Sequence, residues 1–296
     1  NDDDLDFATS TVGGNLTATV TTGNIRAEED TPLTISGTSS FTTRANNGVI
    51  VLNGAFTGAV SLNTTGSAGI AAIHGGTTAL NIAASSIGGP AYLVTGNNIT
   101  DSGTVTVGSN LIVYTTANNG AINLGTLAVD GKLLLYTHGS GNATVVNDAG
   151  LDFIGSRVGG ALTATATTGN ITDTQNYNVL ESNVGTALIV GGPSSFTTGA
   201  SNATITLDDN TNALTGAVAL STRGTSGNAT VDNGTTALNI ATSSVGGNLT
   251  LTSGNASGIT DSGTVTVGGN LSATTDANNG VVNLGTLAVD GAVALS

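Results

Sequence analysis

Apolar and polar residues alternate along most of the chain in short runs, with glycine and asparagine between the runs. The segment LTATVT (16–21) is one example, because every second residue is apolar. Strict alternation is the period of a β-strand with one buried face, and clusters of Gly and Asn are typical of turns. No stretch carries a sustained apolar stripe of helical period. The pattern therefore predicts an all-β protein built from many short strands.

The runs also repeat at two scales. The segment TDSGTVTVGSNL (100–111) returns almost unchanged as TDSGTVTVGGNL (260–271), which predicts two superunits at about 1–146 and 147–296. Within each superunit a phrase of glycine, a polar residue and an alternating run recurs six times, so we expect about twelve coils. Aligned on their first inward apolar residue, the phrases start at Leu16, Phe41, Val60, Ala91, Leu111 and Leu133, and again at Leu162, Phe196, Val218, Leu249, Leu271 and Val293.

Repeats of roughly twenty-five residues that each hold two or three short strands are typical of a β-solenoid. Each coil then lays its strands in parallel register on the previous coil, about 4.8 Å higher. Gly and Asn suit the left-handed backbone expected at coil corners. The sequence thus predicts one continuous, rod-shaped, single-chain parallel β-solenoid over residues 1–296. Both ends stop in mid-pattern, so we expect a segment of a longer array or a subunit that stacks end to end.

Charge limits the possible partners. The net charge is −14, and only five residues are Lys or Arg. Binding to phosphates needs clustered basic residues, so nucleic acid and anionic membranes are not expected partners. No run approaches the 18 apolar residues of a membrane span, so we expect no membrane insertion. Cysteine is absent, which excludes disulfides and thiolate metal sites.

Candidate catalytic and metal-binding groups are scattered. Glycan-cleaving chemistry needs paired carboxylates, or carboxylates beside a basic group, on one face. The five basic residues fall on five different coils, and His74 and His138 stand in no metal-binding spacing. The acidic clusters at 2–6 and 28–30 could bind Ca²⁺, but the calcium β-roll repeat is absent. We therefore predict no catalytic residue, no metal site and no cofactor.

Threonine-rich solenoids can bind ice, and the parity of the alignment offers a test of this idea. If the first aligned residue faces inward, the residues one and three positions later face outward. Too few of these outward pairs are Thr to form a continuous ice-binding face, so ice binding is less favoured. The Thr pairs are Thr17/Thr19, Thr163/Thr165 and Thr250/Thr252.

The same parity test predicts one unusual outward patch. Three consecutive coils of the first superunit place aromatic or aliphatic residues outward, where the second superunit has Thr, Ser and Ala. An exposed apolar patch usually marks a contact site, and tyrosines supply both contact area and a hydrogen-bonding tip. Alternatively, the segment 137–146 covers the patch, or the tyrosines stack for stability. The predicted patch consists of Tyr92, Val94, Ile112, Tyr114, Leu134 and Tyr136.

The segments VGGNLTATVTTGNI (12–25), VTVGGNLSATT (265–275) and GTLAVDGAVALS (285–296) resemble the repetitive shafts of filamentous-haemagglutinin-like bacterial exoproteins and giant surface adhesins. This resemblance implies a right-handed parallel β-helix, a location outside the cell or on the bacterial surface, and a non-catalytic role in attachment or filament formation. The secretion domain of such proteins is not visible in the sequence.

The resemblance also suggests partners. They would be further copies of the chain, stacked end to end or bundled laterally, or a ligand of the cell surface or matrix. Two alternatives stay open. One is a ligand-binding solenoid for glycan or ice, and the less favoured one is a polysaccharide-active β-helix enzyme.

Overall fold

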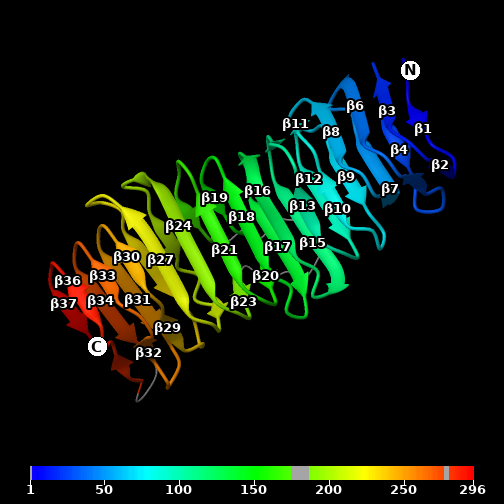
Figure 1. The fold of residues 1–296 in the computed structure, drawn as a ribbon. Helices are drawn as coiled ribbons and strands as arrows, with labels where there is room; N and C mark the ends of the chain where they lie inside the picture. The colour runs from blue at the N-terminus through cyan, green and yellow to red at the C-terminus, as the bar shows by residue number, and fades with distance from the viewer. Residues whose placement is uncertain (1, 175–186, 277–279) are drawn as a thin grey trace. The chain divides into compact units, whose positions relative to one another are not determined.

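The computed structural model describes residues 2–174, 187–276 and 280–296, and these ranges contain strands, turns and bends but no helix. The strands are two to eight residues long. They pair in parallel, and the chain winds through about thirteen coils. The protein is therefore a parallel β-solenoid, as the alternation and the repeats predict. Figure 1 shows the short strands of successive coils lying side by side.

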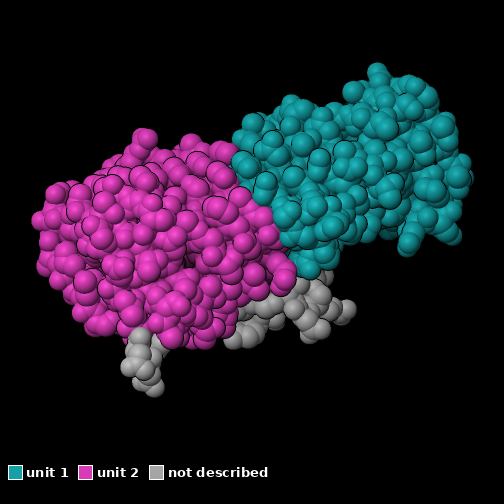
Figure 2. Space-filling model, turned by 60° about the horizontal axis from the view of Figure 1, so that its bottom comes forward, with its two compact units in different colours: residues 1–145 teal, residues 146–296 magenta. Residues whose placement is uncertain are grey.

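The coils form two compact units, residues 1–145 and 146–296, coloured teal and magenta in Figure 2. Each unit has three sheets, which we name by their strands. The long sheet has one strand from each of seven coils, and the short sheet has strands from three coils. The split sheet takes its name from the later coils, where two shorter strands occupy the place of one.

In unit 1 the strands are distributed as follows. The long sheet contains β1 (Leu5–Asp6), β4 (Ile25–Ala27), β7 (Ile50–Phe56), β9 (Ala71–His74), β12 (Ala91–Thr95), β15 (Leu111–Asn118) and β17 (Leu133–His138). The short sheet contains β2 (Ser10–Val12), β5 (Leu33–Ile35) and the C-terminal half of β7. The split sheet contains β3 (Leu16–Val20), β6 (Ser39–Asn46), β8 (Val60–Thr65), β10 (Leu80–Ile82), β11 (Ser85–Ile87), β13 (Ile99–Asp101), β14 (Val105–Val107) and β16 (Ile122–Val129). Strand β18 (Ala143–Asn147) contains the boundary between the units.

Unit 2 repeats this plan. Its long sheet contains β19 (Leu151–Asp152), β22 (Ile171–Thr172), β25 (Ile205–Leu207), β28 (Ala229–Asp232), β31 (Leu249–Ser253), β34 (Leu271–Thr275) and β37 (Val293–Leu295). Its short sheet contains β20 (Arg157–Val158), β23 (Ile189–Val190) and β26 (Ala213–Leu214). Its split sheet contains β21 (Leu162–Ala166), β24 (Ser194–Ser201), β27 (Val218–Arg223), β29 (Leu238–Ile240), β30 (Ser243–Val245), β32 (Ile259–Asp261), β33 (Val265–Val267), β35 (Val282–Asn283) and β36 (Leu287–Val289).

The core of each unit consists of the inward side chains of these strands. On β12, for example, Ala91, Leu93 and Thr95 are buried while Tyr92 and Val94 are half-buried, which is the predicted alternation. Small aliphatic side chains dominate, and a few phenylalanines are buried among them. In unit 1 the rings of Phe7, Phe41 and Phe56 pack edge to face at 6.3 and 6.5 Å.

The coil count exceeds the expected twelve because the aligned phrases lie on two different faces. Val60 starts β8 of the split sheet, whereas Ala91 starts β12 of the long sheet. Between Val60 and Ala91 the chain passes through β9, β10 and β11, so these two residues lie one and a half coils apart and not one coil apart. The alignment correctly separates inward from outward residues. However, it treats all the aligned segments as one face of the solenoid, whereas half of them lie on the split sheet and half on the long sheet.

Asparagines shape several corners between sheets, as their tolerance of left-handed backbone predicts. Asn47, Asn119 and Asn202 have positive φ angles of 62°, 67° and 65°. The side-chain oxygen of Asn47 accepts the main-chain N–H of Ala68 in the next coil at 3.0 Å, and the other two make the corresponding bond to their next coils. Each such Asn therefore both bends the chain and ties one coil to the following one.

Candidate functional site

The six residues of the predicted patch lie together on the outer face of the long sheet of unit 1. Strand register places them in two neighbouring rows that run across β12, β15 and β17. The rows are Tyr92–Ile112–Leu134 and Val94–Tyr114–Tyr136.

The patch is less exposed than the sequence suggests. Five of its side chains are half-buried, and Leu134 is buried at 9% exposure. The rings of Tyr114 and Tyr136 stack at 4.4 Å with an angle of 13° between their planes, and the His138 ring packs against Tyr136 at 5.1 Å. The tyrosine stack considered as an alternative is therefore present. Each ring covers one face of the other, which reduces the ring surface available to a partner.

Tyr136 also influences the protonation of Tyr114. Burial raises the pKa of Tyr114, and the neighbouring Tyr136 raises it further through its charge and a hydrogen bond between the side chains. Burial likewise raises the pKa of Tyr92. The segment 137–146 does not act as a separate covering loop, because it forms the end of β17, a tight turn and most of β18.

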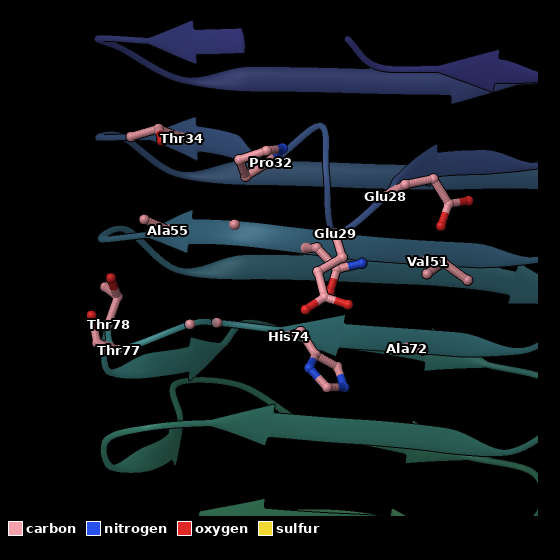
Figure 3. Close-up of a pocket in the computed structure, with 14 residues that line it drawn as sticks. Glu28, Glu29, Pro32, Thr34, Val51, Ala55, Ala72, His74, Thr77 and Thr78 are labelled. Carbon is pink, nitrogen blue, oxygen red and sulfur yellow. The ribbon is translucent and has the colours of Figure 1, made fainter. Parts of the chain in front are cut away.

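A groove of about 700 Å³ lies farther along the same face of unit 1 (Figure 3). Strand register links it to the patch, since Tyr92 pairs with Ala72 and Val94 pairs with His74. Figure 3 shows the Glu29 side chain pointing from the β4–β5 loop toward His74 on β9. The groove is lined by Glu28, Glu29, Pro32, Thr34, Val51, Asn53, Gly54, Ala55, Ala72, His74, Gly75, Gly76, Thr77 and Thr78.

Local hydrogen bonds fix the walls of the groove. The acidic loop closes as a turn in which the N–H of Thr31 donates to the carbonyl of Glu28 at 3.1 Å, and the Thr31 hydroxyl accepts the N–H of Glu28 at 3.2 Å. The Asn53 side-chain amide donates to the carbonyl of Ala27 at 3.0 Å. The groove thus has an acidic wall on one side and the turn at 75–78 on the other.

The remaining candidate groups form no metal centre in the described ranges. No three His, Cys, Asp or Glu side chains there are placed to hold a metal ion. His74 lies in the groove, and His138 lies beside the tyrosine stack. The same ranges hold no helix with the length and apolar character needed to cross a membrane.

A comparison with known protein families shows to which family the chain belongs. A family model described as repeats of unknown function (DUF5649) matches residues 1–63, 140–221 and 226–296, which together make up most of the sequence. The chain belongs to the DUF5649 repeat family. No curated protein and no solved structure matches it.

The chain carries a second regular surface that the sequence alignment missed. On the split sheet of each unit, strand register brings hydroxyl or amide side chains of five successive strands into one outward row. The alignment missed these rows because it compared Thr17/Thr19 on β3 with Thr250/Thr252 on β31, which belongs to the long sheet. The rows are Thr19–Thr42–Asn63–Ser86–Thr106 in unit 1 and Thr165–Thr197–Ser221–Ser244–Thr266 in unit 2.

Proposed function

We propose that this DUF5649 chain is a structural shaft segment of a bacterial extracellular adhesin or surface fibre. The observation that carries the proposal is the continuous strand register within each unit. Each coil of the long sheet pairs with the next, from β1 to β17 and from β19 to β37. A solenoid gains length by adding coils that contact only their neighbours, which suits a protein whose role is to span distance.

The distribution of polar groups supports a non-catalytic role. The long sheet of unit 2 presents mostly Thr and Ser outward, and the two histidines of unit 1 lie in different surroundings. The tyrosine patch on unit 1 would then be a lateral contact, either with a neighbouring shaft or with a surface ligand.

Electron microscopy of the native material, combined with the mass of the denatured chain, tests this function. We expect long thin rods made of a very large polypeptide. Rods of the same width that dissolve into chains near 28.6 kDa would instead indicate a fibre polymerised from this chain. Isolated short particles would contradict both forms of the proposal. The variant Tyr114→Thr with Tyr136→Thr tests the patch, and it should reduce bundling while leaving single rods intact.

The split-sheet rows favour a second candidate function, the binding of an ordered surface such as ice. Their outward groups repeat every coil, about 4.8 Å apart. Thermal hysteresis of the purified chain tests it. If hysteresis is present, Thr197→Tyr with Ser244→Tyr should abolish it, whereas Thr230→Tyr on the long sheet should not. Absence of hysteresis would exclude ice as the ligand.

A further inference from the structure

The stacked pair Tyr114 and Tyr136 joins two neighbouring coils of unit 1 through side chains. The two residues are direct partners in the register of β15 and β17, one strand spacing of about 4.8 Å apart. Their rings stack at 4.4 Å with 13° between the planes, and a hydrogen bond links the two side chains. The rings therefore point the same way, which brings the ring carbons beside the two oxygens close to each other.

The corresponding residues of unit 2 also link two coils. Tyr114 corresponds to Thr274 and Tyr136 corresponds to Ser296, because the segments around them are repeated in the sequence. The hydroxyl oxygens of Thr274 and Ser296 lie 3.1 Å apart and share a hydrogen bond. Both units thus link corresponding strands at this place through side chains. In unit 1 the link is an aromatic pair, which can be oxidised.

The composition of the chain directs oxidation to tyrosine. Cysteine, methionine and tryptophan, the side chains that oxidants usually attack first, are all absent from the sequence. Of the four tyrosines, Tyr177 lies outside the described residues, and Tyr92 pairs in register with Ile112 and not with another tyrosine. Tyr114 and Tyr136 are half-buried, so part of each ring faces solvent. In the described part of the chain, an oxidant therefore meets one tyrosine pair that is already aligned.

We propose that Tyr114 and Tyr136 are a modification site, at which a one-electron oxidant converts the stacked pair into a covalent dityrosine bridge between two coils. The stack holds the rings together before oxidation, so the bridge needs only a rotation of the two side chains. Because the chain has no cysteine, such a bridge supplies the covalent link between coils that a disulfide cannot. The proposal goes beyond the shaft function and does not depend on it.

The reaction balances with two molecules of oxidant. Each tyrosine gives one electron to an oxidant molecule and releases its hydroxyl proton to water, which leaves a phenoxyl radical. The two radicals combine at the ring carbons beside their oxygens and form one C–C bond. The hydrogen on each of these carbons then moves as a proton to the ring oxygen, which restores both phenols. In total two C–H bonds break, one C–C bond forms, and two electrons and two protons leave the pair.

The experiment treats the dilute, purified chain with a ruthenium(III) complex generated by light, which is a small one-electron oxidant. We expect the monomer to gain the blue fluorescence of dityrosine and to lose the mass of two hydrogen atoms. The product is then unfolded and digested with trypsin, which cuts after Lys132 and so separates Tyr114 from Tyr136 in the unmodified chain. In the oxidised chain, the tryptic peptides 45–132 and 133–157 should stay joined.

Two variants separate the stacked pair from the other tyrosines. Tyr114→Phe keeps an aromatic ring in the stack but cannot form a phenoxyl radical, so the joined peptides should disappear. Tyr92→Phe is the matched control, because Tyr92 lies on the same tryptic peptide as Tyr114, and it should leave the bridge unchanged. Circular dichroism verifies that both variants are folded. The bridge should also raise the melting temperature of the wild-type chain by about 4 °C, because it closes a loop in the unfolded state.

Three results would overturn the proposal. The first is an oxidised wild-type chain that contains no dityrosine. The second is a pair of peptides that stays joined in the folded Tyr114→Phe variant, because another tyrosine would then form the bond. The third is dityrosine that occurs only in covalent dimers, because the rings would then react between chains. None of these results bears on whether the native material forms rods, so a failure here is distinct from a failure of the shaft function.

Discussion

At the scale of single residues, two aspartates explain why the segment TDSGTVTVG appears twice. Asp101 accepts the main-chain N–H groups of Gly125 and Thr126 at 3.0 and 2.7 Å. Asp261 accepts those of Gly285 and Thr286 at 2.8 Å each. In both units the aspartate thus ties its own coil to the Gly-Thr pair of the next coil. The same sequence occurs in both units because it makes the same hydrogen bonds between neighbouring coils.

These bonds make the stability of unit 2 dependent on pH. Partial burial alone would raise the pKa of Asp261, but the N–H groups of Gly285 and Thr286 outweigh it and hold that pKa below its usual value of 3.8. A lowered pKa in the folded state contributes stability above the unfolded pKa, and this contribution is lost as the pH falls through the folded pKa.

Replacement of Asp261 should therefore matter at neutral pH and not in acid. We expect Asp261→Asn to lower the melting temperature by about 2–4 °C at pH 7, equivalent to about one hydrogen bond. The difference from the wild type should shrink as the pH falls through the lowered pKa of the folded state, because below it the aspartate is protonated in both states. Thermal melts at pH 7 and at a series of acidic pH values measure this. The exposed Asp148→Asn serves as the control, and an effect of Asp261→Asn that stays constant with pH would contradict the interpretation.

At the scale of strands and corners, buried threonines close the turns between sheets. Thr64 lies at the end of β8, and its hydroxyl donates to the carbonyl of Gly69 at 2.9 Å while accepting the N–H of Gly88 at 3.2 Å. One inward hydroxyl thus satisfies a turn carbonyl of its own coil and an N–H of the next. The same bond to the carbonyl five residues later is made by Thr115, Thr198 and Thr222.

Loss of this hydroxyl should be costly, because the half-buried N–H of Gly88 would lose its partner and the buried carbonyl of Gly69 would keep only its bond from the N–H of Gly89. We expect Thr64→Val, which keeps the shape of the side chain, to destabilise the protein by about 1–2 kcal/mol. Thr106→Val, at an exposed outward position, should change stability by less than about 0.5 kcal/mol. Urea unfolding of both variants measures the difference. Equal effects would mean that the corner bonds add little to stability.

The sequence predicts which segments form strands and turns better than it predicts which strands lie next to one another in the solenoid. Alternation correctly separates inward from outward residues, because it depends only on the period of a strand. It cannot tell that the step from Val60 to Ala91 covers one and a half coils, since glycine-rich turns of different length look alike. The groove escaped prediction for the same reason. Its walls at Ala55 and Glu28 come together only once the coils are stacked.

At the scale of the whole molecule, the sparse basic residues lie in ordered backbone. Arg26, Arg44, Arg157 and Arg223 lie within β4, β6, β20 and β27, and Lys132 immediately precedes β17. A protease cleaves such sites only after local unfolding, whose probability falls with the free energy of opening. In a solenoid, each interior strand is paired on both sides, so opening one coil breaks two sets of pairings.

This arrangement predicts marked resistance to trypsin under native conditions. The folded chain should stay intact at a protease concentration that cuts the urea-unfolded chain at all five basic residues. Gel electrophoresis over a time course measures the ratio of the two rates. Rapid native cleavage at one site would show that its strand opens independently of its neighbours. Uniform rapid cleavage at all five would contradict the stability on which a shaft function depends, because an extracellular fibre must outlast the proteases around it.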